Sequence, residues 1–412
     1  MTRRTGSADL PLHGGRVPAW LATRMSALGA VIVEAIVLHY GRDELLRRLA
    51  HPIWFQSFGA VMGMDWHSSG ITTSVLGALK RGLAPLADEL GIYVCGGRGR
   101  HSRDTPAELL RAGERTGIDG EALARTSRLV AKVDSAALQD GYELYLHGFI
   151  VTREGRWCVV QQGMNGERRE ARRYHWLSEG LTTFVDSPHA AVEGRRGGTI
   201  VNLADARAAR SRRESLALAQ AGPTRTLEVL RWHAARGSPA LDLFAAPEPA
   251  SSGSSELPRL QLPSHHDVRA SDIDLRRLRA TLSAAADRGP AEFEELLLLG
   301  GVGARTVAAL AFVAEVLHGA PSRFSDPARF SLAHGGKDGH PFPVPLKVYD
   351  ETLRVMRGAV TRARLGNDDR LAAIERLDRE ARRLDRAADG PSLEQHLASE
   401  RAASAELGGR TV

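Results

Sequence analysis

The stretch Leu296-Leu-Leu-Leu-Gly-Gly-Val-Gly-Ala-Arg-Thr-Val-Ala-Ala-Leu310 decides how the second half of this 412-residue chain is interpreted. Four leucines end at Gly300, and a new apolar run begins after Thr306. The pattern predicts a short helix, a glycine turn and a second helix. Glycine suits such a turn because its backbone reaches positive φ and allows close approach of a partner. Amides at the start of the second helix would then favour an anion, since the helix dipole is positive there.

This element resembles the helix-hairpin-helix of DNA-binding proteins, in which apolar residues alternate with two glycines ahead of a small and a basic or polar residue. The natural anion for it is a nucleic-acid phosphate, a contact that positions the strand without reading its sequence. Under this interpretation Gly301, Gly303, Arg305 and Thr306 hold a backbone phosphate. The alternative is an ordinary helix–turn–helix in which glycine only ends the first helix.

Composition and charge set broad limits on the class of protein. The chain is 43% hydrophobic and 25% charged, with a net charge of +6, which is typical of a globular protein of two or three domains. An arginine-rich, basic chain suits phosphate ligands, although a GC-rich genome produces the same bias. Cys95 and Cys158 stand far apart, which argues against a thiolate zinc site and a disulfide scaffold. Without a signal peptide or a membrane-length apolar run, we expect a cytoplasmic protein with no membrane partner.

The order of the segments predicts a mixed α/β fold followed by a helical one. We expect a mixed α/β N-terminal domain with a short β-hairpin sheet at 1–220 and a linker or long surface loop at 221–265. A helical, helix-hairpin-helix DNA-binding domain should follow at 266–365, and a charged helical tail, partly disordered, at 366–412. The oligomeric state is not determined by these patterns.

Two basic segments are candidates for the path of a nucleic-acid strand. The strand-like Gly91–Cys95 leads into a loop of glycines with Arg98, Arg100 and Arg103. Its spacing fits neither a nucleotide-binding P-loop nor a dinucleotide fingerprint, so a polyanion is the expected ligand. Arg172 and Arg173 precede Tyr174-His-Trp176, and aromatic residues among arginines are typical of nucleic-acid grooves.

Acidic residues around a predicted β-hairpin suggest metal-dependent phosphodiester cleavage. Strands are expected at 142–152 and 157–162. Asp134, Asp140 and Glu143 would bind Mg²⁺ or Mn²⁺, which activates water and neutralises charge at the phosphate. Nucleases with such a hairpin place an acidic residue on the second strand, where this chain has Gln161. The alternative is a polar strand end that faces solvent.

Histidines in the same region are candidate general acids or bases. His147 lies in the middle of the first strand, and His175 follows the paired arginines. Either could move a proton at neutral pH, while a lone histidine is more often structural.

A lysine nucleophile is a third possibility. Bifunctional base-excision glycosylases combine a helix-hairpin-helix with a lysine that attacks the sugar carbon. Lys337-Asp338 lies downstream of the glycine turn, at a longer separation than in that class. The nearer Asp326, in Ser-Asp-Pro, is expected to be a turn or helix-capping residue. Otherwise Lys337 would only touch phosphate.

Three pieces in this order carry a family resemblance: Gln161-Gln-Gly-Met-Asn165, the glycines at 300–303 and His334-Gly-Gly-Lys-Asp-Gly339. With them the chain resembles the DUF763 family from Arg4 to about Arg357. The resemblance implies a domain of unknown function with a helix-hairpin-helix near its end, and it assigns no catalytic residue.

The combined prediction is a DNA-processing enzyme, a metal-dependent nuclease in DNA repair whose partner is nucleic acid. One alternative is a DNA glycosylase or AP lyase that uses Lys337 and Asp338 on a flipped nucleotide. The other is a non-catalytic DNA-binding protein.

Overall fold

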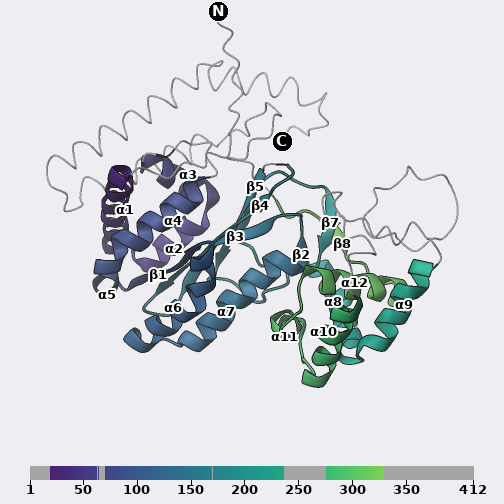
Figure 1. Cartoon of the computed structure of the whole chain (residues 1–412). Helices are drawn as coiled ribbons and strands as arrows, with labels where there is room; N and C mark the ends of the chain where they lie inside the picture. The colour runs from purple at the N-terminus through teal and green to yellow at the C-terminus, as the bar shows by residue number, and fades with distance from the viewer. Residues whose placement is uncertain (1–18, 63, 65–69, 169, 236–274, 329–412) are drawn as a thin grey trace, which may run out of the picture.

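A computed structural model describes residues 19–62, 64, 70–168, 170–235 and 275–328. Successive residues of the strands point to opposite faces of a central sheet, and helices cover both faces. In the central sheet, Cys158 and Val160 point to one hydrophobic cluster, whereas Trp157 and Val159 point to a second. Both faces of the sheet are therefore buried, as the near-continuous apolar run of that strand requires. Figure 1 shows the sheet between two groups of helices.

The central sheet has five strands in the order β1-β3-β4-β5-β6, and each neighbouring pair is antiparallel. The predicted hairpin is confirmed, with Gly155 at φ 81° in its turn. The second strand of the hairpin, β4, extends beyond the predicted 157–162 to Asn165. It pairs with β5, which the basic segment after it forms. The strands are β1 (Ile92–Arg98), β3 (Glu143–Thr152), β4 (Trp157–Asn165), β5 (Glu170–Leu177) and β6 (Ala191–Glu193).

Helices from the first ninety residues cover one face of this sheet (Figure 1). They are α1 (Ala19–Tyr40), α2 (Arg42–Ala50), α3 (Pro52–Val61), α4 (Gly70–Leu83), the short helical turn η1 (Ala84–Leu86) and α5 (Ala87–Leu90). Helix α1 continues through Gly29 without a break. Gly29 packs against Met62, so this glycine serves close helix packing and not a break.

The opposite face of the sheet is covered by helices that follow β1. These are α6 (Arg100–Thr116), α7 (Gly120–Lys132) and the π-helical turn η2 (Val133–Ala137). The expected glycine and arginine loop is wrong, since β1 extends to Arg98 and α6 begins at Arg100. At Gly96, with φ 89°, an added Cβ would lie 2.2 Å from the His147 carbonyl oxygen, so the glycine permits β1 to pair closely with β3.

The remaining elements extend this second core. A three-stranded antiparallel sheet has the order β2-β7-β8, and the helices lie beside it in Figure 1. The elements are β2 (Leu138–Gln139), β7 (Thr199–Asn202), the short helical turn η3 (Ala206–Ala208), α8 (Ala209–Gln220), α9 (Pro223–Ala235), α10 (Leu275–Arg288), α11 (Phe293–Leu298), α12 (Ala304–His318) and β8 (Arg323–Ser325).

The helices at the C-terminal side share one hydrophobic cluster with the sheet. Phe149 and Trp176 of the sheet belong to the same buried cluster as Leu282 of α10 and Leu310 of α12. Helix α9 occupies the first part of the segment expected to be a linker. The rest of that segment, the tail at 366–412 and the pair Lys337 and Asp338 lie outside the described residues. Within the described residues, no helix has the length and apolar character needed to cross a bilayer.

Candidate functional site

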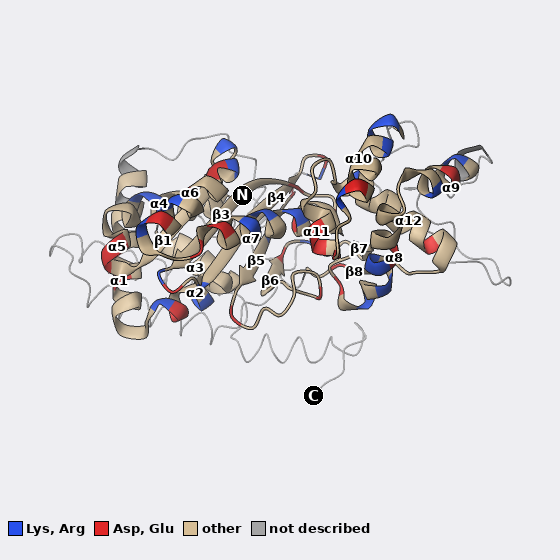
Figure 2. Ribbon diagram, turned by 90° about the horizontal axis from the view of Figure 1, so that it is seen from below, with Lys and Arg blue, Asp and Glu red and all other residues tan. Residues whose placement is uncertain are grey.

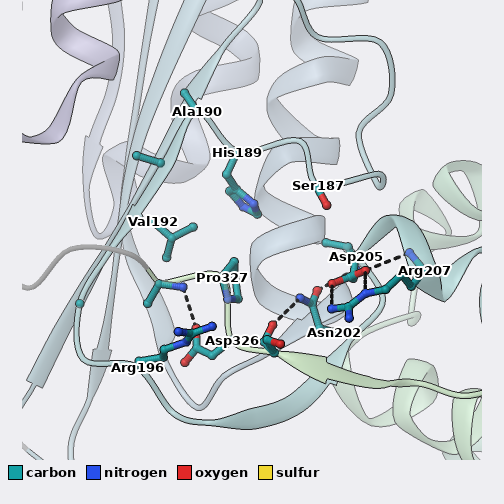
Figure 3. A pocket seen from close by; sticks show the side chains of 15 residues that line it. Ser187, His189, Ala190, Val192, Arg196, Asn202, Asp205, Arg207, Asp326 and Pro327 are labelled. Carbon is teal, nitrogen blue, oxygen red and sulfur yellow. Dashed lines mark hydrogen bonds and ion pairs between the residues drawn. The ribbon is translucent and has the colours of Figure 1, made fainter. Parts of the chain in front are cut away.

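A cavity of about 620 Å³ opens where β6, β7 and β8 meet (Figure 3). It lies beside the central sheet, on the side of the second hydrophobic cluster. The polar residues that line it are Ser187, His189, Arg196, Asn202, Asp205, Arg207, Ser325 and Asp326. A cavity of this size, lined by convergent polar and charged side chains, is a candidate ligand or active site.

The central pair of the cavity is a histidine held by a buried carboxylate. His189, in the loop between β5 and β6, donates from Nε2 to Oδ1 of Asp134 over 2.5 Å. The Asp134 side chain is fully buried in η2, and the His189 side chain is 6% exposed. The Trp176 ring packs on the His189 ring with 4.5 Å between centroids. Since Nε2 carries the proton for Asp134, Nδ1 is left as the acceptor nitrogen.

A chain of hydrogen bonds holds Asp134 from behind. Gln161 Nε2 donates to Asp134 Oδ2 over 2.5 Å, and Trp176 Nε1 donates to the same oxygen over 2.9 Å. His147 Nδ1 donates to Gln161 Oε1 over 2.6 Å, and its Nε2 accepts from the Ser127 hydroxyl over 2.9 Å. The carboxylate is thus fixed by three donors, counting His189, and it orients the histidine ring.

His147 and Gln161 were predicted to be catalytic, but the structure places them behind the cavity. His147 is 5% exposed, and both of its ring nitrogens have partners inside the protein. Burial lowers the pKa of His147, so it stays neutral near pH 7. Gln161 is fully buried. Both are therefore positioning residues for Asp134, and the expectation that His147 moves protons for a substrate is wrong.

A second buried network joins β5 to the floor of the cavity. The Arg172 guanidinium donates to Asp140 Oδ2 over 2.8 Å and to both oxygens of Asp326 over 3.0 and 2.8 Å. Tyr174 also donates to Asp140 Oδ2, over 2.7 Å. Burial raises the pKa of Asp140, and the Arg172 charge opposes that shift. Arg172 is 1% exposed, so its predicted contact with DNA is wrong and its role is internal.

The neighbouring residues of β5 point to the opposite face of the sheet. The Arg173 guanidinium forms an ion pair with the buried Glu193 and donates to Gln56 Oε1 over 2.9 Å. Its Nε donates to His175 Nε2 over 2.9 Å. Burial, reinforced by the Arg173 charge, lowers the pKa of His175 to about 3. The predictions that Arg173 binds DNA and that His175 moves protons are therefore wrong, because both are sealed beneath α2 and α3.

The three carboxylates predicted to bind metal do not form one site. Asp134 and Asp140 lie in separate hydrogen-bond networks, and Glu143 is exposed at the start of β3. Among the described residues, no group of three or more His, Cys, Asp or Glu side chains could hold a metal ion. These residues do not fit the Mg²⁺ or Mn²⁺ site expected from the sequence.

The arginines predicted around residue 100 lie on the surface away from the cavity lining. Arg98 ends β1 and packs its guanidinium 5.7 Å from the centre of the Tyr145 ring. Arg100 and Arg103 are exposed in the first turn of α6. Their contact with DNA stays a prediction.

The glycine turn between α11 and α12 is partly exposed. Gly300 and Gly301 lie at the surface, Val302 is buried, and Gly301 has φ 88°. Arg305 is exposed, whereas the Thr306 side chain is 6% exposed and turned inward. A contact between the Thr306 hydroxyl and a phosphate is therefore not supported.

The turn also packs directly on the segment that carries Asp134. Lys132 Nζ donates to the carbonyl oxygen of Val302, and Gln139 Nε2 donates to that of Ala304 over 3.0 Å. Lys132 and Gln139 flank η2 on its two sides. The glycine turn and the carboxylate of the cavity thus belong to one packed unit.

Several cavity residues were missed by reasoning from the sequence. His189 follows Ser187-Pro188 in an irregular loop, and the Asp205 carboxylate accepts hydrogen bonds from the amide and the guanidinium of Arg207. Ser187 has φ 55°, the one positive φ of a non-glycine residue in the described segments. A strained residue at a cavity is a recognised mark of function, but no periodicity or motif signals it in the sequence.

The comparisons with known proteins identify the family. Residues 6–344 match the family described as "Protein of unknown function (DUF763)", and the chain therefore belongs to it. The match covers most of the chain, as the resemblance predicted. Searches of curated proteins and of solved structures find no match.

Proposed function

We propose that this protein is an enzyme that cleaves phosphodiester bonds in nucleic acid at the cavity that contains His189. The single observation that carries the proposal is the Asp134–His189 pair, in which a buried carboxylate orients a histidine that lines an open cavity. A histidine held in this way can act as a general base and then a general acid.

The residues of the cavity suggest how such a reaction would proceed. A water oxygen attacks phosphorus while His189 Nδ1 takes the proton of that water. The bond from phosphorus to the leaving oxygen breaks, and the imidazolium returns the proton to that oxygen. Asp134 stabilises the imidazolium in between. Arg196, exposed at the rim, would stabilise the negative charge on the phosphate.

The surface around the C-terminal helices supports a nucleic acid as the substrate. The glycine turn lies against α10, since an added Cβ on Gly301 would be 2.9 Å from Thr281 of that helix. Helix α10 exposes Arg276, Arg277 and Arg279, and Figure 2 shows basic residues along α8, α9 and α10. A helix-hairpin-helix interpretation of α11, the turn and α12 fits this basic setting, with the amides near Gly301 and Gly303 facing a phosphate.

The test is a cleavage assay on labelled DNA. Single-stranded, duplex, branched and damaged substrates are incubated with Mg²⁺, Mn²⁺ or EDTA and separated on a denaturing gel. We expect His189→Ala to lower the cleavage rate by about 10²–10⁴-fold, the contribution typical of a general acid or base. The control is His101→Ala, because His101 also lies near an aspartate, Asp104, but on the exposed surface of α6 and 3.6 Å from it. Cleavage that persists in the His189 variant would remove this proposal.

A second candidate function is binding of DNA without catalysis. The exposure of Gly300 and Gly301 ahead of α12 favours it, since a phosphate could contact this turn without entering the cavity. The expected result is then retention of labelled DNA with no product under any metal condition. A glycosylase or lyase, which would use Lys337 and Asp338, is tested by borohydride trapping and the loss of a covalent adduct in Lys337→Ala.

A further inference from the structure

A second hollow, of about 420 Å³, adjoins the cavity and contains three arginines. Its lining consists of Arg168, Glu170, Arg195, Arg196 and Gly197. Arg196 also lines the cavity with His189, so the two spaces meet at this side chain. A group bound in the smaller hollow would therefore lie next to the proposed reaction site.

The loop that carries two of these arginines is anchored from inside the protein. Arg172 donates to the carbonyl oxygen of Arg195 over 2.5 Å, and the Gly197 amide donates to Asp326 Oδ2 over 2.6 Å. The amide of Asp326 in turn donates to the Gly198 carbonyl oxygen over 2.8 Å. This explains why the chain buries the Arg172 and Asp326 charges: they fix the backbone while the Arg195 and Arg196 side chains extend outward.

The third arginine is held in the same manner from the turn between β4 and β5. The Arg168 amide donates to Asn165 Oδ1 over 2.9 Å. Asn165 is 4% exposed and donates from Nδ2 to the Gly141 carbonyl oxygen over 3.1 Å. Fixed backbones on both sides of the hollow reduce the entropy lost when the side chains close on a ligand.

The charge of the hollow favours an anion. Glu170 is the one carboxylate among the described residues that line it, and that group already accepts hydrogen bonds from the Tyr142 hydroxyl over 3.0 Å and from Arg195 over 3.4 Å. Arg168 and Arg196 are both exposed. Guanidinium groups bind phosphate through paired, charge-assisted hydrogen bonds, which neither a neutral nor a cationic ligand would use.

We propose that Arg168, Arg195 and Arg196 form a phosphate subsite that takes a backbone phosphate of the nucleic-acid strand being cleaved. The subsite rests on the proposed function for the identity of its ligand. It would hold the phosphate next to the scissile one, and so place the scissile phosphodiester at His189.

The test measures binding apart from cleavage. The full chain carrying His189→Ala is titrated onto fluorescent single-stranded DNA and RNA of the same sequence. Fluorescence anisotropy gives the affinity at about five salt concentrations, from about 50 to about 300 mM. The added changes Arg168→Ala and Arg196→Ala should weaken binding and reduce the slope of log affinity against log salt by about 1 for each arginine. The matched control removes two exposed arginines elsewhere, Arg81→Ala on α4 and Arg111→Ala on α6.

The outcomes separate the subsite from the proposed function. A smaller slope with the subsite variants, but not with the control variants, supports the subsite on whichever nucleic acid binds. The subsite is overturned if the salt slope is the same for the subsite and the control variants. It is also overturned if neither the DNA nor the RNA binds. If the slope falls as expected while the unmutated chain cleaves nothing, the subsite stands and the proposed catalysis fails.

Discussion

The two faces of β5 carry the same kinds of residue and differ in what lies beyond them. On one face, Arg172 bonds to Asp326, which lines the cavity, and Trp176 bonds to Asp134, which holds the cavity residue His189. On the other, Arg173 and His175 bond to each other, and Arg173 pairs with Glu193 in a core sealed by α2 and α3. Burial and hydrogen bonding do not distinguish the faces, since the side chains of both are almost fully enclosed.

The difference teaches that a buried polar network indicates a functional site only when one of its residues lines a cavity. The chain from Ser127 through His147 and Gln161 to Asp134 ends at His189, which lines a cavity. The network of Arg173 ends at groups that are themselves buried. The predictions below test this contrast, beginning with the largest effect.

Replacing Arg173 should strongly lower the stability of the protein, because Arg173 lies on the face of β5 that α2 and α3 cover. In Arg173→Met the buried carboxylate of Glu193 loses its cation, and breaking such a pair costs about 3–5 kcal/mol of the free energy of unfolding. Urea denaturation measures this loss. The double variant Arg173→Met with Glu193→Gln should recover much of it, because no uncompensated charge remains. A single variant as stable as the unmutated chain would show that the pair does not hold this face.

The closed face should also make stability depend on pH through His175. Its pKa is about 3 in the folded chain and about 6.5 when unfolded, so below pH 6.5 the unfolded chain binds a proton that the folded chain does not. The free energy of unfolding should therefore fall as pH decreases from about 6.5 towards 3, by about 1.4 kcal/mol per pH unit. Urea midpoints at pH 7, 6 and 5 measure it.

The control for this pH effect compares two histidine variants. His175→Asn should reduce the slope of stability against pH, while the exposed His101→Ala should leave it unchanged. Part of the slope will persist in His175→Asn, because burial also lowers the pKa of His147. An unchanged slope in the His175 variant would contradict the assignment.

The smallest effect on stability is expected at the glycine turn, which packs on the residues that flank η2. Gly301 has φ 88°, and an added Cβ would lie 2.9 Å from Thr281 Oγ1. Gly301→Ala should therefore cost about 1–2 kcal/mol in the free energy of unfolding. Gly300→Ala is the matched control, because its Cβ would meet no atom within 4 Å. Equal thermal midpoints for the two variants would show that the turn is not constrained by α10.

Much of the fold could be predicted from local patterns. The run of apolar and β-branched residues around Arg153-Glu-Gly-Arg156 gave the β3–β4 hairpin, and Leu296–Leu310 gave two helices separated by a glycine turn. Asp134, one of the residues singled out from the sequence, accepts a hydrogen bond from the cavity residue His189. In the described structure its neighbour is His189, and the two carboxylates predicted to share a metal ion with it, Asp140 and Glu143, lie elsewhere.

The basic strand β5 could not be interpreted from its sequence. Two adjacent arginines among aromatic residues indicate a surface groove unless carboxylates elsewhere neutralise them. The partners of Arg172 are 32 and 154 positions away, at Asp140 and Asp326. No local pattern records such contacts, so burial of the pair was unpredictable.

What the sequence by itself determined is part of the set of elements, namely the β3–β4 hairpin and the two helices on either side of the glycine turn, together with membership of the family. These depend on periodicity and on short-range backbone preferences. The tertiary structure alone decided which polar residues meet a cavity. Successive residues of one strand point to opposite faces of the sheet, so the neighbours Arg172 and Arg173 belong to different hydrogen-bond networks. His189 joins Asp134 only because η2 and the loop before β6 are brought together by the folded sheet.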